Sequence, residues 1–275
     1  MAILAISRGT ASGAEALAHM VATQLGYPYL NREQAVVAAA KQYRIPLEEL
    51  TAAMERRPSF WGRALSPHVA FLPAMRATLC ASIQQENLVY CGYAGHLLLP
   101  RIPLVVTVRA VAEREVRTHA AQKRKPLSHA QALAELDAED RTRREWAHFL
   151  FGVDWQDPTL YDLVVNLSRV DLETAGAMVL RLAESPQYQP TPASRQALAD
   201  FALFSRVTAI LAMDFRTRDA RLKVTVDKGV VTITGTTRWA EVAEAVPAVV
   251  QQVKGVTAVK SEITGGIPPP GLTWY

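Results

Sequence analysis

The fold is decided near the start of the chain by residues 3–28, which read ILAISRGTASGAEALAHMVATQLGYP. Ile3–Ile6 is a short apolar run, typical of a buried strand, and a loop of small and polar residues, Ser7–Glu15, follows it. Apolar residues then recur at helical spacing from Leu17 to Leu25. Gly26 suits the left-handed conformation that ends many helices. The stretch therefore predicts a strand, a loop and a helix in direct succession.

Further along the chain, three more apolar runs have the length of buried strands: Leu88–Cys91, Leu104–Val108 and Leu163–Val165. Helical patterns separate them. Strands that alternate with helices predict a parallel sheet with helices on both faces. We therefore expect residues 1–185 to form an α/β domain with a three-layer parallel sheet.

A second, smaller unit follows a short segment that contains several prolines, residues 186–194, which we expect to be a semi-rigid linker. Beyond it the pattern predicts, in order, a helix, two strands, a helix and a strand, at 195–212, Leu222–Val226, Val230–Thr236, 239–253 and Val256–Ile263. Residues 195–264 are thus expected to be an α+β domain of order αββαβ. Residues 265–275 are a Pro-rich tail with no helix or strand pattern, and an extended polyproline conformation is expected there.

Composition narrows the class of protein. The 275 residues are 49% apolar and 20% charged, which is typical of a folded globular chain. The net charge of +4 has no clustered basic stripe, so nucleic acid is not an expected partner. Two cysteines and six histidines show no metal-ligand spacing, so no metal site is expected. Without a basic leader or a run of about twenty apolar residues, the chain is expected to be cytoplasmic.

The loop after the first predicted strand is a candidate phosphate site. Backbone N–H groups of such a loop, together with the dipole of the following helix, attract an anion. The loop lacks the pattern GxxxxGK[ST], and the same turn also serves many α/β proteins as a plain connection. The candidate ligand residues here are Ser7, Arg8, Gly9, Thr10, Ala11, Ser12, Gly13 and Ala14.

Blocks in a consistent register give the chain a family resemblance over about residues 1–185. They are Ser7-Arg8, Ala11–Ala14, Leu25–Pro28, Asn31–Glu33, Gly92–Gly95, Asp137–Arg143, Gly152–Trp155 and Tyr161–Asn166. This set resembles the cytidylate kinase-like family, a branch of the P-loop nucleoside monophosphate kinases. The resemblance implies a nucleotide ligand, ATP or a nucleoside monophosphate, and Mg²⁺ if the protein is active.

The resemblance also adds candidate site residues outside the loop. Guanidinium groups suit phosphate oxygens, so the arginines of the matching blocks are candidates. Asp140 would orient an arginine or bind a ribose hydroxyl. The other interpretation is that the helical arginines belong to a solvated helix face. The added candidates are Arg32, Gly92, Arg114, Arg117, Asp140 and Arg143.

Departures from the family pattern favour weak or absent catalysis. Ala14 stands where the family usually has lysine. Other residues that replace the family's polar or charged groups are Glu15, Asn31, Tyr93 and Leu136. Phosphoryl transfer depends on positioned cations, so losing several of them favours a nucleotide-binding pseudoenzyme. Two alternatives stay open: an active CMP-type kinase that uses ATP, and a non-catalytic interaction platform.

Residues 198–264 resemble a BON domain. The resemblance rests on the hairpin at 222–235, with Gly229 at its turn, and on Lys254-Gly255-Val256. It implies a module for sensing, tethering or oligomerisation and no catalytic group. The partners implied by this resemblance are a second copy of the chain (a homo-oligomer), another protein or a weakly bound anionic lipid.

Overall fold

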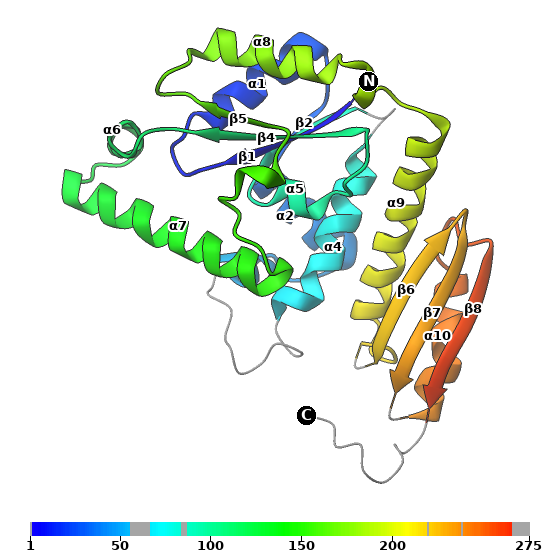
Figure 1. Ribbon diagram of the computed structural model, residues 1–275. Coiled ribbons are helices and arrows are strands. Elements are labelled where there is room, and N and C mark those ends of the chain that lie inside the picture. The colour runs from blue at the N-terminus through cyan, green and yellow to red at the C-terminus, as the bar shows by residue number, and fades with distance from the viewer. Residues whose placement is uncertain (1, 56–66, 84–86, 219, 238, 266–275) are drawn as a thin grey trace.

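The computed structural model describes residues 2–55, 67–83, 87–218, 220–237 and 239–265. The proline-bearing part of the tail, on which the polyproline expectation falls, lies outside these residues. Within them the chain forms two sheets of different size (Figure 1).

The larger sheet has five parallel strands in the order β2-β3-β1-β4-β5. They are β1 (Ile3–Arg8), β2 (Tyr29–Asn31), β3 (Leu88–Gly92), β4 (Val105–Val111) and β5 (Leu163–Asn166). The predicted α/β class is confirmed. The short edge strand β2 was not predicted, because three half-buried residues carry too little apolar pattern to identify a strand.

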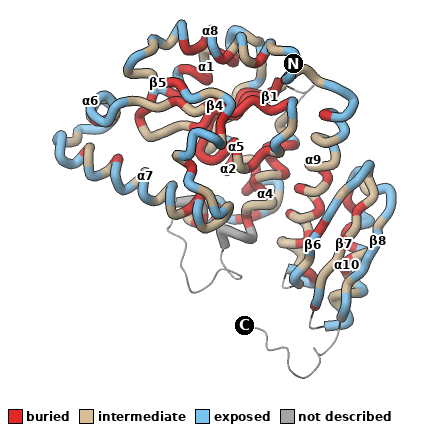
Figure 2. The backbone as a smooth tube through the Cα atoms, viewed as in Figure 1, coloured by how far each residue is buried: buried red, intermediate tan, exposed pale blue. Residues whose placement is uncertain are grey.

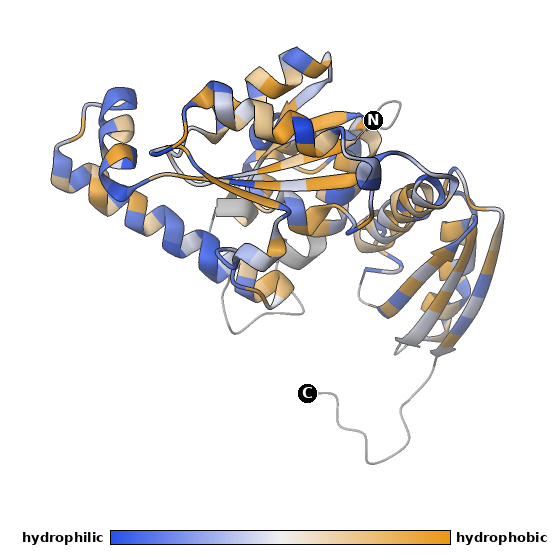
Figure 3. Cartoon of the chain, turned by 45° about the horizontal axis from the view of Figure 1, so that its top comes forward, coloured by the Kyte–Doolittle hydropathy of each residue, from blue (hydrophilic) through white to orange (hydrophobic). Residues whose placement is uncertain are grey.

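Helices cover both faces of this sheet, so it has two apolar cores. Alternate residues of β1 enter opposite cores: Ile3 and Ala5 enter one, Leu4 and Ile6 the other. Figure 3 shows the strands of the large sheet as mostly hydrophobic. The helices of this domain are α1 (Ala14–Leu25), α2 (Arg32–Tyr43), α3 (Leu47–Glu55), α4 (Pro67–Ser82), α5 (Gly95–Leu98), α6 (Arg114–Arg124), α7 (His129–Phe151) and α8 (Leu172–Ala183).

The smaller sheet has the order β6-β7-β8, with β6 and β7 antiparallel and β7 and β8 parallel. Lys228 and Gly229 both have positive φ, 48° and 84°, which is the geometry of a tight hairpin turn. This unit has the expected order αββαβ. Its elements are α9 (Pro192–Met213), β6 (Arg221–Asp227), β7 (Val230–Thr237), α10 (Ala240–Gln251) and β8 (Ala258–Gly265).

Helix α9 joins the two units. It begins at Pro192, inside the segment expected to be a linker, where Thr191 and Ser194 form a capping box. Earlier in that segment, Tyr188 is buried against the core of the first domain. Residues 186–194 are therefore not a free spacer. Proline is favoured in the first turn of a helix, so Pro192 continues into α9 and does not break the chain there.

The two sides of α9 belong to different cores. Leu198 packs against the core of the first domain, beside α4, whereas Leu203 and Val207 belong to the core of the second. Figure 2 shows α9 between α4 and the small sheet. By length and composition α9 is the one helix in the described residues that could cross a membrane. No such helix was expected from the sequence, and here its apolar surface contacts protein on both sides.

Candidate functional site

The loop between β1 and α1 has a backbone suited to an anion. Gly13 lies at the start of α1 with φ of 83°, and Ala11 has φ of 54°. A Cβ atom on Gly13 would lie 3.0 Å from Cδ1 of Leu167, so both φ and packing favour glycine there. Helix α1 has no side-chain cap at its N-terminus. Its first N–H groups therefore remain available to an acceptor from outside the helix.

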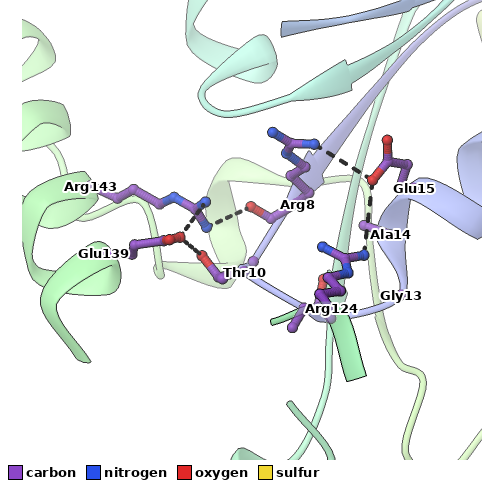
Figure 4. Close-up of a pocket in the computed structure, with 11 residues that line it drawn as sticks. Arg8, Thr10, Gly13, Ala14, Glu15, Arg124, Glu139 and Arg143 are labelled. Carbon is purple, nitrogen blue, oxygen red and sulfur yellow. Dashed lines mark hydrogen bonds and ion pairs between the residues drawn. The ribbon is translucent and has the colours of Figure 1, made fainter. Parts of the chain in front are cut away.

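These residues line a pocket of about 180 Å³. Figure 4 shows how arginine and glutamate side chains from several elements converge on it. Ser12 is 3% exposed, and its hydroxyl oxygen has no hydrogen-bond partner in the described part of the chain. The lining residues are Arg8, Gly9, Thr10, Ala11, Ser12, Gly13, Ala14, Glu15, Arg124, Glu139 and Arg143.

Arg8 lies between two carboxylates. Its guanidinium donates to Oε1 of Glu33 at 2.5 Å and lies 3.7 Å from Oε2 of Glu15. Burial acts to lower the pKa of Arg8, but Glu33 and Glu15 outweigh it and the pKa is raised. Arg124, at the end of α6, lies 4.0 Å from the same Glu15 oxygen. Glu15 thus bridges two cations at the edge of the pocket.

Arg143 reaches the pocket from α7. Its Nη1 donates to the carbonyl oxygen of Arg8 at 3.1 Å, and its Nη2 lies 3.4 Å from Oε2 of Glu139. That carboxylate oxygen also accepts a hydrogen bond from the hydroxyl of Thr10. The loop and α7 are therefore connected by an arginine and a glutamate that both line the pocket.

Asp140 and Arg117 form a second connection next to the pocket. The guanidinium of Arg117 donates two hydrogen bonds to the Asp140 carboxylate, at 2.8 and 3.0 Å, and one to the carbonyl oxygen of Thr10 at 2.8 Å. Of the two roles expected for Asp140, this geometry matches that of orienting an arginine. Arg114 does not line the pocket; it is exposed and pairs with Asp137.

Three other predicted residues are not brought into the pocket. Ser7 is fully buried, and its hydroxyl oxygen lies 3.5 Å from that of Tyr161. Gly92 ends β3, where an added Cβ would lie 2.4 Å from the hydroxyl oxygen of Tyr90. Arg32 begins α2.

Three lining residues were not among the predicted site residues. Glu15 was named from the sequence only as a departure from the family pattern. Glu139 lies four residues before Arg143, a spacing at which helical side chains of opposite charge pair, so a signal was present. No sequence spacing pointed to Arg124. It lines the pocket only because the fold brings the C-terminal end of α6 to it.

An aromatic cluster fills the space beyond β3. Tyr93 is 4% exposed and packs on Trp146 and Trp155, with ring centroids 5.0 and 6.2 Å apart. Its hydroxyl donates to the backbone carbonyl of Arg143. Both tryptophans are buried. This side of the domain is closed by packing.

His96, in the neighbouring helix α5, is also buried. Burial, with Arg109 and Arg101 nearby, lowers its pKa to about 4. The imidazole is therefore neutral at physiological pH. Within the described residues no cluster of three histidine, cysteine or acidic side chains could hold a metal ion.

Comparisons with known proteins agree with this architecture. The model of the cytidylate kinase-like family matches residues 3–169, and that of the BON domain matches residues 199–266. A cytidylate kinase of Halobacterium salinarum is 24% identical over 194 residues, which cover 69% of this chain and 95% of that protein.

Solved structures match over about the same part of the chain. An uncharacterized protein from Eubacterium ventriosum has a TM-score of 0.52 at 17% identity, over 67% of this chain and 99% of that one. A shikimate kinase from Bacteroides thetaiotaomicron has a TM-score of 0.42 at 12% identity, over 67% and 99% of the two chains.

Proposed function

The chain belongs to the cytidylate kinase-like family and carries a C-terminal BON domain, and from that premise we propose that it binds a phosphate-bearing nucleotide with little or no phosphoryl transfer. The binding site is the pocket at the N-terminus of α1. The BON domain serves to sense, tether or oligomerise, and the protein acts in the cytoplasm.

One observation carries the proposal: the Ser12 hydroxyl is buried in the pocket wall without a hydrogen-bond partner in the described residues. A buried polar group without a hydrogen-bond partner costs about 1–3 kcal/mol. A ligand that hydrogen-bonds to the Ser12 hydroxyl is the best explanation for such a group in this wall. An uncapped helix N-terminus and three arginines surround the same space, which supports an anionic ligand.

Weak transfer is supported by what replaces the expected cations. Ala14 stands at the position of the usual lysine and is buried, so it contributes no charge. Tyr93, at the acceptor-side arginine position, lies within the aromatic cluster. Transfer needs cations beside both the moving phosphoryl group and the acceptor, whereas binding needs them at one place only.

A working kinase is the second candidate, because Arg8, Arg124 and Arg143 converge on one pocket. In that case these arginines would replace the missing lysine, and ATP, a CMP-type acceptor and Mg²⁺ would be required.

Binding is tested by thermal unfolding of the full chain with CMP, CDP, CTP and ATP at millimolar concentration. Ligand binding to the folded state raises Tm by mass action. No shift with any of the four nucleotides would contradict the proposal.

Transfer is tested by a coupled assay with ATP, CMP and Mg²⁺. We expect a rate far below that of ordinary kinases. Turnover of about 1 per second, the low end of kinase rates, would favour the working kinase instead.

Membrane tethering by the second domain is tested with anionic vesicles. Each basic residue that reaches the surface contributes about 1 kcal/mol at most, so binding should be weak and lost in salt. Tight binding, seen as co-sedimentation with the vesicles that salt does not reduce, would contradict this account.

A further inference from the structure

The pocket has a small net charge for a site lined by three arginines. Two glutamates, Glu15 and Glu139, line it as well, so the lining residues that the structure describes carry one net positive charge. The N-terminus of α1 adds the equivalent of about half a charge. A phosphomonoester carries about −1.5 to −2 at pH 7, which this field matches. A triphosphate brings considerably more negative charge.

Glu15 lies where a longer phosphate chain would need cations. It is in the first turn of α1, and its carboxylate lies 3.7 Å from Arg8 and 4.0 Å from Arg124. Figure 4 shows its side chain between these two guanidinium groups. A second phosphate group that approached either arginine would meet this carboxylate and be repelled by it.

The size of the pocket agrees with its charge. Its volume of about 180 Å³ is below the roughly 300–1,000 Å³ typical of pockets that enclose a whole small-molecule ligand. The Ser12 hydroxyl on its wall, which has no partner among the residues described, is a ready donor for one anionic group.

We propose that the pocket accepts a single phosphate group, that of a nucleoside monophosphate, and that Glu15 is the residue that excludes a second and a third. This inference rests on the proposed function, since it specifies the ligand of the same site.

The experiment measures dissociation constants of the full chain for CMP, CTP, phosphate and pyrophosphate by titration calorimetry in EDTA. Wild type should bind CMP more tightly than CTP, and phosphate more tightly than pyrophosphate. Glu15→Gln should raise the ratio of CTP affinity to CMP affinity by at least about tenfold, a change of about 1.4 kcal/mol. Glu15 is partly exposed, at 37%, so the variant should fold; its melting curve without ligand verifies this.

Glu33→Gln is the matched control. Glu33 also pairs with Arg8, at 2.5 Å, but does not line the pocket. Its loss should change the affinities for CMP and CTP by the same factor.

Three results would overturn the inference. The first is a wild type that binds CTP as tightly as CMP, and the second is equal effects of the two variants on the CMP-to-CTP ratio. The third comes from a parallel titration with Mg²⁺ in place of EDTA. It is a preference for CTP over CMP that appears in wild type and is lost in Glu15→Gln, which would make Glu15 a metal ligand. If none of the four anions binds, and ATP and CDP cause no shift in Tm either, the proposed function itself is refuted and the inference with it.

Discussion

Strands β1 and β3 are neighbours in the sheet, and Ser7 and Gly92 are register partners near their ends. Beyond Ser7 the chain forms a polar pocket with a buried hydroxyl and three arginines. Beyond Gly92 it forms an aromatic cluster in which Tyr93 packs on two tryptophans. The two regions start from the same edge of the same sheet and differ in the residues that follow each strand and in the distant side chains that pack there.

The difference teaches that binding and transfer make separate demands on this fold. An anion is held by one loop and one helix N-terminus, so a single strand end is sufficient for it. Transfer requires cations placed around both the donor and the acceptor. Here the second strand end is filled by packed aromatic rings, which contribute to folding.

The largest expected effect lies in the aromatic cluster. Trp146→Ala should destabilise the protein by about 3–5 kcal/mol, because it removes a large buried side chain and leaves a cavity. Urea unfolding measures the loss, and Trp146→Phe should retain part of the stability. A loss below about 1 kcal/mol would show that the cluster is not a packed core.

A pH titration of stability examines the same region without mutating the cluster. His96 has a folded pKa of about 4, below its ordinary 6.5. Between those values the unfolded chain binds the proton and the folded chain does not, so stability should fall as pH falls through this window. The loss should approach about 3.5 kcal/mol, at about 1.4 kcal/mol for each unit of pKa. Unfolding midpoints of wild type and His96→Gln should show a smaller slope in the variant; equal slopes would assign the effect to other groups.

On the pocket side, Ser12→Ala should separate binding from stability. The free energy of unfolding should change little or rise, because the variant removes a buried hydroxyl that has no partner in the described part of the chain. Nucleotide affinity should fall by about 1.5–3 kcal/mol, the value of a hydrogen bond to a charged group. Calorimetry of the two proteins provides the comparison. Unchanged affinity would place the ligand away from Ser12.

The smallest effect is expected at Arg114. The sequence placed it among the candidate site residues, but in the structure it does not line the pocket. Its side chain is 59% exposed in its pair with Asp137. Surface pairs contribute about 0–1 kcal/mol, so Arg114→Ala should leave both stability and nucleotide affinity nearly unchanged. A several-fold loss of affinity would return Arg114 to the site.

The sequence predicted the parts of this comparison that depend on local pattern. The strand, loop and helix of residues 3–28 carry their own apolar spacing and terminating glycine, so the cradle around Ser12 was foreseen. Arg124 and the filling of the second strand end by Tyr93 were not. Both depend on how distant helices fold back on the sheet, which one sequence does not specify. The start of α9 was misjudged because a proline begins a helix as readily as it ends one.

A crystal structure of the full chain soaked in CMP tests the central claim most directly, because it compares both strand ends in one map. We expect the phosphate group within hydrogen-bond distance of the Ser12 hydroxyl and the first N–H groups of α1. The aromatic cluster around Tyr93 should be unchanged. A phosphate group bound beyond Gly92, with Tyr93 displaced, would contradict the account.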